Sequence, residues 1–238
     1  MESRRVESFS DGVFAVAITV LVFNLLPIAD STVRGYGDLF SHWPQYSAYV
    51  VSFLTIGIMW LNHHTVLTYV AKVDRVTLVL NTLLLMGVVA VPFPTALIAE
   101  SLAPTRHVSA RPVAVPYVSP EVAAVAYGLL LIAISVAFSG TWQYLAAHQD
   151  KLGARPMKIP LQATIRFSAG LAGYVVGTVV AIFSPDIALA IYAIIAVYYL
   201  FEHLPDPSAG SESEAAAAAD HADVEAGESS SPAPGSSD

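Results

Sequence analysis

Polar side chains able to do chemistry occur inside stretches of the sequence that are otherwise apolar. They are Arg5, Ser10, Asp11, Trp60, Asn62, His63, His64, Asn81 and Arg166. Serine, histidine and aspartate form the triads of hydrolases, while histidine and aspartate also carry protons in membrane carriers. A third possibility is structural, because polar groups inside a membrane tend to pair with one another.

The spacing of these residues argues against catalysis. Ser10 and Asp11 are adjacent, so on a helix their side chains diverge by about 100°. The pair His63 and His64 lacks the i, i+4 spacing of a metalloprotease helix. With no cysteine in the chain, thiol catalysis, thiolate metal sites and disulfides are excluded. The sequence therefore predicts no enzyme, no cofactor, no catalytic residue and no resident metal site.

The composition is that of a membrane protein. Of 238 residues, 55% are hydrophobic and only 13% are charged, and the mean hydropathy is +0.60. The net charge of −8 comes from the end of the chain, since acids but no Lys or Arg follow Leu204. That end is rich in Ala, Ser, Glu, Asp, Gly and Pro, too polar to form a core. We predict a membrane domain, 1–204, and a disordered acidic cytoplasmic tail, 205–238, whose partner is left open.

Six segments are long and apolar enough, or nearly so, to cross a bilayer as helices. The hydrocarbon core is about 30 Å thick and needs about 20 apolar residues in a helix. The segments are roughly 7–28, 44–69, 75–101, 121–146, 161–183 and 186–203. We expect helices because unpaired backbone groups are too costly in lipid. The predicted fold is an all-α integral membrane protein with six transmembrane helices.

The basic residues predict the orientation of these helices. Those on one side are Arg4, Arg5, Lys72, Arg75, Lys151, Arg155 and Lys158, against only Arg34, Arg106 and Arg111 in loops on the other. By the positive-inside rule, both termini are cytoplasmic in a multi-pass protein of the cell (plasma) membrane. The proline-rich segment 104–120 is then an irregular external loop.

Counting residues from the basic positions places the polar groups at one depth. Asp11 lies six residues after Arg5, about 9 Å along a helix at about 1.5 Å per residue. Asn81 lies six residues after Arg75, and the TrpLeuAsnHisHis segment lies eight to twelve residues before Lys72. We predict one polar cluster on the cytoplasmic side, in which the first helix meets the others. Its centre is Arg5, Ser10 and Asp11 against His63 or His64, Asn81 and Arg166, and we group Phe9, Trp60 and Asn62 with them.

Two points about this cluster stay open. Each polar residue can instead be satisfied by a separate neighbour, or can reach the interface, which is easy for Arg5 and Arg166. Adjacent histidines point about 100° apart on a helix, so His63 and His64 cannot both face the same partner.

Two motifs resemble a known family. Arg5, Phe9, Ser10 and Asp11 form the pattern Arg-x-x-x-Phe-Ser-Asp at the start of the first helix, and the TrpLeuAsnHisHis segment follows in the second. In this setting, residues 4 to about 204 resemble bacterial members of the transmembrane protein 175 family of potassium channels. The resemblance implies a potassium-permeable homotetramer in the bilayer, with one six-helix unit per chain and no nucleic-acid partner. It also implies that the motif residues bond to neighbouring helices.

The resemblance further implies that the first helix lines a central pore without the ThrValGlyTyrGly filter, which this sequence lacks. Val16, Thr19, Val20 and Phe23 share one face of this helix with Gly12. By family position, Val16 is an apolar constriction, Thr19 a hydroxyl layer, and Val20 and Phe23 further apolar layers. Apolar rings offer an ion no ligands, so the ion passes largely hydrated or the pore dewets. Val16 stands where Ile or Leu is commoner in the family. The sequence therefore does not decide which of Val16, Val20 and Phe23 forms the narrowest ring.

Two alternatives compete with the pore. Val16, Val20 and Phe23 can simply pack in a bundle core. The chain can also be a secondary ion transporter with an Asp11/His63 proton relay, since such groups mark proton paths in carriers. Against the transporter, the polar groups lie near one membrane face, and we expect no glycine or proline break that would form a half-helix site.

Overall fold

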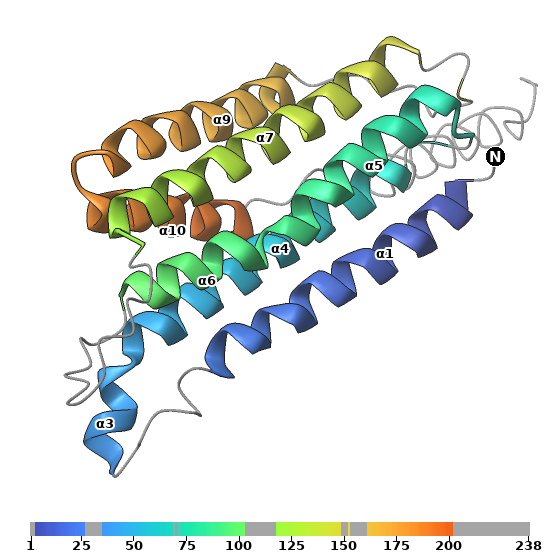
Figure 1. The fold of residues 1–238 in the computed structure, drawn as a ribbon. Helices are drawn as coiled ribbons and strands as arrows, with labels where there is room; N and C mark the ends of the chain where they lie inside the picture. Colours follow the sequence, from blue (N-terminus) through green and yellow to red (C-terminus); the bar gives the residue numbers. More distant parts are fainter. Residues whose placement is uncertain are drawn as a thin grey trace, which may run out of the picture. The chain divides into compact units, whose positions relative to one another are not determined.

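The computed structural model describes residues 3–26, 35–68, 70, 72–102, 118–148, 152 and 161–201, without the side chains of Asp38 and 161–168. The regular structure of these residues is helical (Figure 1). The predicted acidic tail and its boundary after residue 204 lie outside them, as does most of the predicted external loop 104–120.

The first helix has one buried face and tightens at its end. α1 (Ser3–Val20) continues as η1, a 3₁₀-helix (Leu21–Leu25). The residues buried along it recur every three or four positions, which is the period of one helix face: Val6, Ser10, Phe14, Ala17 and Leu21. This face packs against α4 (Trp43–Thr68) and α5 (Arg75–Ala90). A short helix, α3 (Tyr36–Ser41), precedes α4.

The third predicted span is broken by prolines. α5 ends at Ala90, and α6 (Pro92–Ser101) follows after Val91. Pro92 and Pro94 lack the backbone N–H that a continuous helix needs, so carbonyls one turn earlier lose their partners. Side chains add bonds beside the break: Thr95 Oγ1 donates to the Val91 carbonyl at 2.8 Å, and Asn24 Nδ2 of η1 donates to the Pro92 carbonyl at 3.1 Å. The range 75–101 is therefore helical, but the expectation that no span contains a proline break is wrong.

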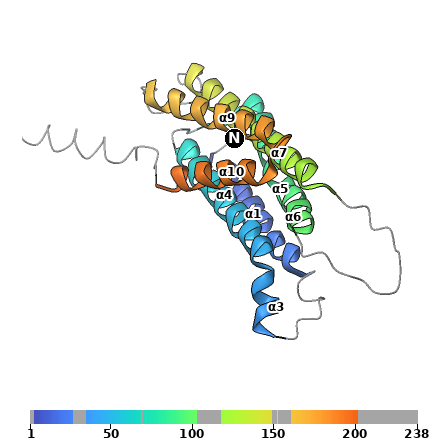
Figure 2. The ribbon, with the colours of Figure 1, turned by 90° about the vertical axis from the view of Figure 1, so that its left-hand side faces the viewer.

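The last three helices form a closely packed group. α7 (Pro120–Ala147) begins with proline at its first position and with Ser119 as N-cap, whose Oγ accepts from Val122 N at 3.4 Å. α9 (Leu161–Ala181) and α10 (Pro185–Phe201) are joined by a tight turn and pack on each other and on α7. Figures 1 and 2 show α9 running beside α7, and Figure 2 shows α10 crossing the direction of α4.

Two apolar cores lie between these helices. The larger one joins every long helix and includes Phe14, Leu84, Leu131, Tyr174 and Tyr192. The smaller one lies near the N-terminus of α1 and the C-termini of α4 and α7, where Val6, Val66, Trp142 and Leu145 meet. A backbone hydrogen bond lies beside this smaller core, in which Lys72 N donates to the Leu152 carbonyl at 3.0 Å.

The helices suit a membrane. Four of them, within the described residues, are long and apolar enough to cross one: Ser3–Leu25, Trp43–Thr68, Arg75–Ser101 and Pro120–Ala147. The apolar helices Ala169–Ala181 and Pro185–Phe201 are shorter. The chain is thus an all-helical multi-pass membrane protein, while the count of six spans and the side on which the termini lie stay predictions.

Candidate functional site

A chain of hydrogen bonds links α1, α5 and α4 in the buried interior. His63 Nε2 lies 2.7 Å from Asn81 Oδ1, and Asn81 Nδ2 donates to Ser10 Oγ at 3.1 Å. Ser10 Oγ in turn donates to the Val6 carbonyl at 2.8 Å. All three side chains are buried, Ser10 completely. Three helices are therefore tied at one depth by uncharged groups.

The direction of this chain indicates which nitrogen of the His63 imidazole carries a proton. The Val6 carbonyl can only accept, so the Ser10 hydroxyl donates to it and accepts from the Asn81 amide. Asn81 Oδ1 then faces His63 Nε2, which must carry a proton. The other nitrogen, Nδ1, is buried without a hydrogen-bond partner among the described residues. A bare lone pair there costs less than a buried N–H would, which favours this arrangement over the flipped amide.

A second set of contacts ties the more accessible side of α1 to α4. Trp60 Nε1 donates to Asp11 Oδ1 at 2.8 Å. One turn later on α4 and one turn earlier on α1, His64 Nδ1 lies 3.0 Å from Glu7 Oε1. The rings of Trp60 and His64 are 6.0 Å apart. The two histidines thus contact different partners, as their divergence on the helix requires.

Two residues of the site were missed in the sequence. Glu7 lies four residues before Asp11 and so on the same helix face, which was the available signal. The Phe14 ring packs against the His63 imidazole with centroids 5.3 Å apart. An apolar residue in an apolar helix gave no signal of this contact.

Other predicted residues lie apart from this network. Asn62 faces the opposite side of α4, toward α7, α9 and α10. Arg5 and Phe9 are exposed. The side chain of Arg166 lies outside the described residues. Within those residues, no group of three or more His, Asp or Glu side chains could hold a metal ion.

The predicted pore residues lie mostly on the uncovered face of α1. Val16 is 57% exposed and Phe23 is 59% exposed in the single chain, Thr19 is exposed, and Val20 is half-buried. The Thr19 hydroxyl donates to the Val16 carbonyl at 2.9 Å, which directs its oxygen along the helix surface. From Gly12 to Phe23, the face opposite the buried stripe is therefore apolar apart from the Thr19 hydroxyl.

A polar contact joins the start of α5 to the end of α7. Asp74 is the N-cap of α5 and accepts from Thr77 N at 2.9 Å and Thr77 Oγ1 at 2.7 Å. Its other oxygen accepts from the Tyr144 hydroxyl at 2.6 Å. The hydrogen bond from Tyr144, together with those from Thr77, lowers the pKa of Asp74 to about 2. Asp74 therefore fixes the N-terminus of α5 against α7.

Comparisons with known proteins agree with this arrangement. The family described as endosomal/lysosomal potassium channel TMEM175 matches residues 5–92. A Streptomyces collinus protein named as a potassium channel is 43% identical over 209 residues, covering 87% of this chain and 96% of that protein. The chain belongs to the TMEM175 family. A Chamaesiphon minutus protein, also named as a potassium channel, is 36% identical over 204 residues, covering 83% and 93% of the two chains.

A solved structure adds the fold. The crystal structure of a TMEM175 homolog from Chamaesiphon minutus, described as a lysosomal potassium-selective channel, matches with a TM-score of 0.65 and 33% identity. It covers 83% of this chain and 96% of that chain. The TMEM175 match at 5–92 begins at Arg5 and ends at Pro92, so it includes most of α1, all of α4 and α5, and both motifs. Membership in the TMEM175 family also places the chain among ion channels rather than enzymes.

Proposed function

We propose that this protein is a potassium-permeable channel of the cell membrane, formed by four copies with six transmembrane helices each. The observation that carries the proposal is family membership together with close relatives named as potassium channels. The geometry supports a role for α1 in the pore, because α1 buries one face and, from Gly12 onward, leaves a face uncovered that is apolar apart from Thr19. Both termini are proposed to be cytoplasmic.

Four copies of α1 around an axis would place Val16, Thr19, Val20 and Phe23 in successive rings. Apolar rings offer no ligands to replace the hydration shell of an ion. The diameter of the rings therefore governs whether water fills the pore. The Thr19 hydroxyls are the polar groups on this face that can contact a hydrated potassium ion. The rings of Val16 and Phe23 are the proposed constrictions.

The polar cluster then has a structural role. The Ser10–Asn81–His63 chain and the Trp60–Asp11 bond hold α1 to α5 and α4 at one end. These bonds set the tilt of α1 relative to α4 and α5. The other end of α1 lies about two turns beyond Asp11, so a change of tilt moves that end. Through the tilt of α1, the polar cluster therefore sets the diameter of the proposed constriction.

The proton-relay transporter is less well supported. Asp11 bonds to Trp60 and His63 bonds to Asn81, so among the described residues no hydrogen bond joins the proposed relay partners. The break at Pro92 does resemble the discontinuous helices of carriers. However, the Pro92 carbonyl is already bonded to Asn24 rather than free for a substrate.

Bilayer recordings with potassium on one side and sodium on the other test channel and selectivity together. The expected result is a current without a counter-ion, whose reversal potential indicates preference for potassium. Flux that saturates and requires a counter-ion would instead establish a transporter. The mass of the purified detergent complex tests the assembly, with four copies of the 25.2 kDa chain expected.

A further inference from the structure

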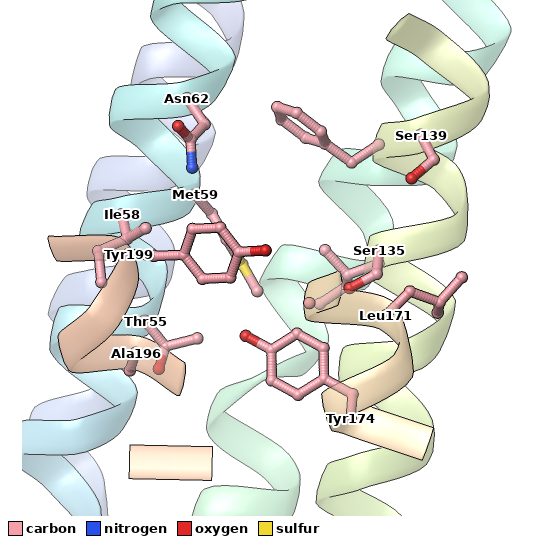
Figure 3. Close-up of a pocket in the computed structure, with 13 residues that line it drawn as sticks. Thr55, Ile58, Met59, Asn62, Ser135, Ser139, Leu171, Tyr174, Ala196 and Tyr199 are labelled. Atoms are coloured by element: carbon pink, nitrogen blue, oxygen red, sulfur yellow. The ribbon is translucent and has the colours of Figure 1, made fainter. Parts of the chain in front are cut away.

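A pocket separate from the polar cluster lies between α4, α7, α9 and α10. Its volume is about 70 Å³. The polar groups that line it come from all four helices: Thr55, Asn62, Ser135, Ser139, Tyr174 and Tyr199. Figure 3 shows the hydroxyls of Tyr174 and Tyr199 pointing toward the middle of the pocket from α9 and α10.

The pocket exists because small side chains meet where four helices approach. Ser135 and Ser139 lie one turn apart on the same face of α7, and Gly170 and Ala196 line the pocket from α9 and α10. At Gly170 even a methyl group would collide with the Tyr199 hydroxyl. The glycine therefore lets the Tyr199 ring lie against α9, with its hydroxyl in the pocket rather than at the protein surface.

The TrpLeuAsnHisHis segment serves both sites. Trp60, His63 and His64 turn toward α1 and α5, whereas Asn62 points into the pocket (Figure 3). Asn62 lies six residues before the end of α4, and Ser139 lies eight residues before the end of α7. The pocket is therefore close to the same end of the helices as Lys72 and Asp74.

We propose that this pocket is a binding site for water inside each subunit, reached from the end of the bundle that carries Asp74. Six polar side chains line the pocket, and a water molecule needs two to four polar partners. One water molecule needs about 10–15 Å³ of pocket volume, so the pocket has room for water. Among the described lining residues none is charged, which favours a neutral ligand over an ion.

Such water would complete the packing between the α9–α10 pair and the rest of the bundle. Tyr174 and Tyr199 come from that pair, and Asn62 and Ser139 come from α4 and α7. Bridging water can join such groups almost as well as a direct hydrogen bond. The α9–α10 pair is then held to α4 through water molecules that can exchange with solvent.

Exchange of a single thiol proton tests this site, because the chain has no cysteine and gives no background. Ser139→Cys is reconstituted in lipid, transferred to deuterated buffer, and followed by the infrared S–H stretch, since a thiol exchanges its proton only where water reaches it. Val88→Cys, in the fully buried core, and Val136→Cys, on the outward face of α7, are the controls. The expected result is exchange at Ser139→Cys at least tenfold faster than at either control. Equal rates at Ser139→Cys and Val88→Cys would overturn the proposal.

Filling the pocket provides the second test. Adding Ser135→Leu to Ser139→Cys is expected to slow thiol exchange to the rate of Val88→Cys. Undiminished exchange in the filled variant would mean that water reaches residue 139 by another route, and would also overturn the site. Because the measurement needs no current, it can succeed or fail independently of the proposed channel function.

Discussion

The indole nitrogen of Trp60 on α4 donates a 2.8 Å hydrogen bond to the carboxylate of Asp11 on α1. This bond gives the Asp11 carboxylate a hydrogen-bond donor inside a helix that is apolar enough to cross a membrane. It also joins two residues 49 positions apart in the chain. Helix α1 is thus held in place by α4 as well as by its own apolar face.

Trp60→Phe keeps the aromatic ring but removes the donor to Asp11. Hydrogen bonds between membrane helices are worth about 1 kcal/mol, so we expect the free energy of unfolding in detergent to fall by about that amount. Trp43→Phe is the matched control, since Trp43 is 67% exposed at the start of the same helix. Equal stability of the two variants would contradict the structural role of the Trp60–Asp11 bond.

Asn81→Leu removes the acceptor of His63 Nε2 and leaves a buried N–H unbonded. We expect a loss of about 1–3 kcal/mol, because an unsatisfied buried group carries its full desolvation cost. His63→Leu combined with Asn81→Leu removes both groups and should cost less than the two single losses added together. Strict additivity in denaturant unfolding of the four proteins would show that the two side chains are not coupled.

Val16→Ala and Phe23→Ala widen the two proposed constrictions. We expect a larger single-channel conductance and weaker discrimination between potassium and sodium, since a wider apolar ring dewets less readily. Val89→Ala is the control, because Val89 is also exposed but lies on α5. Unchanged conductance and selectivity at positions 16 and 23 would show that α1 does not line the narrow part of the pore.

The Asp74 contacts predict a pH dependence of stability. Hydrogen bonds from Tyr144 and Thr77 lower the folded pKa to about 2 from the usual 3.8, so the folded state binds this proton less readily than the unfolded state. The stabilisation is complete above the unfolded pKa and is lost as the pH falls from about 4 through about 2. Unfolding curves across this range should show the loss in the natural protein.

Tyr144→Phe and Asp74→Asn are the comparisons for that measurement. Tyr144→Phe removes the strongest contribution to the lowered pKa, so the loss of stability should shift to higher pH and become smaller. Asp74→Asn has no carboxyl group to titrate, and its stability should lack this step. An identical step in Asp74→Asn would assign the acid sensitivity to another group.

Helix positions could be predicted more fully than side-chain directions. Apolar length alone located the helices to within a few residues at most ends, because a bilayer needs a fixed number of apolar residues. Counting from basic residues put Ser10, Asn81 and His63 at a similar depth, and these three side chains form one chain of hydrogen bonds. It could not give rotation about the helix axis, which is why Asn62 was grouped with residues that it faces away from.

The remaining differences arise from backbone bonding. The prolines at 92 and 94 were visible in the sequence, but hydropathy does not register a missing N–H. Asn24, whose amide donates to the Pro92 carbonyl at the break, lies 68 residues from Pro92. The shift from α1 to η1 also gave no signal, since the apolar pattern of Leu21–Leu25 fits both helix types.

The change to 3₁₀ geometry after Val20 alters what four copies of the first helix would build. In such a helix, residues three apart are eclipsed and are separated by about 6 Å along the axis, so Val20 and Phe23 are aligned in one line instead of being offset around the helix. In the proposed tetramer their side chains would merge into a continuous apolar sleeve. A permeating ion would then meet one long dry passage, whose resistance depends on its length as much as on its narrowest point.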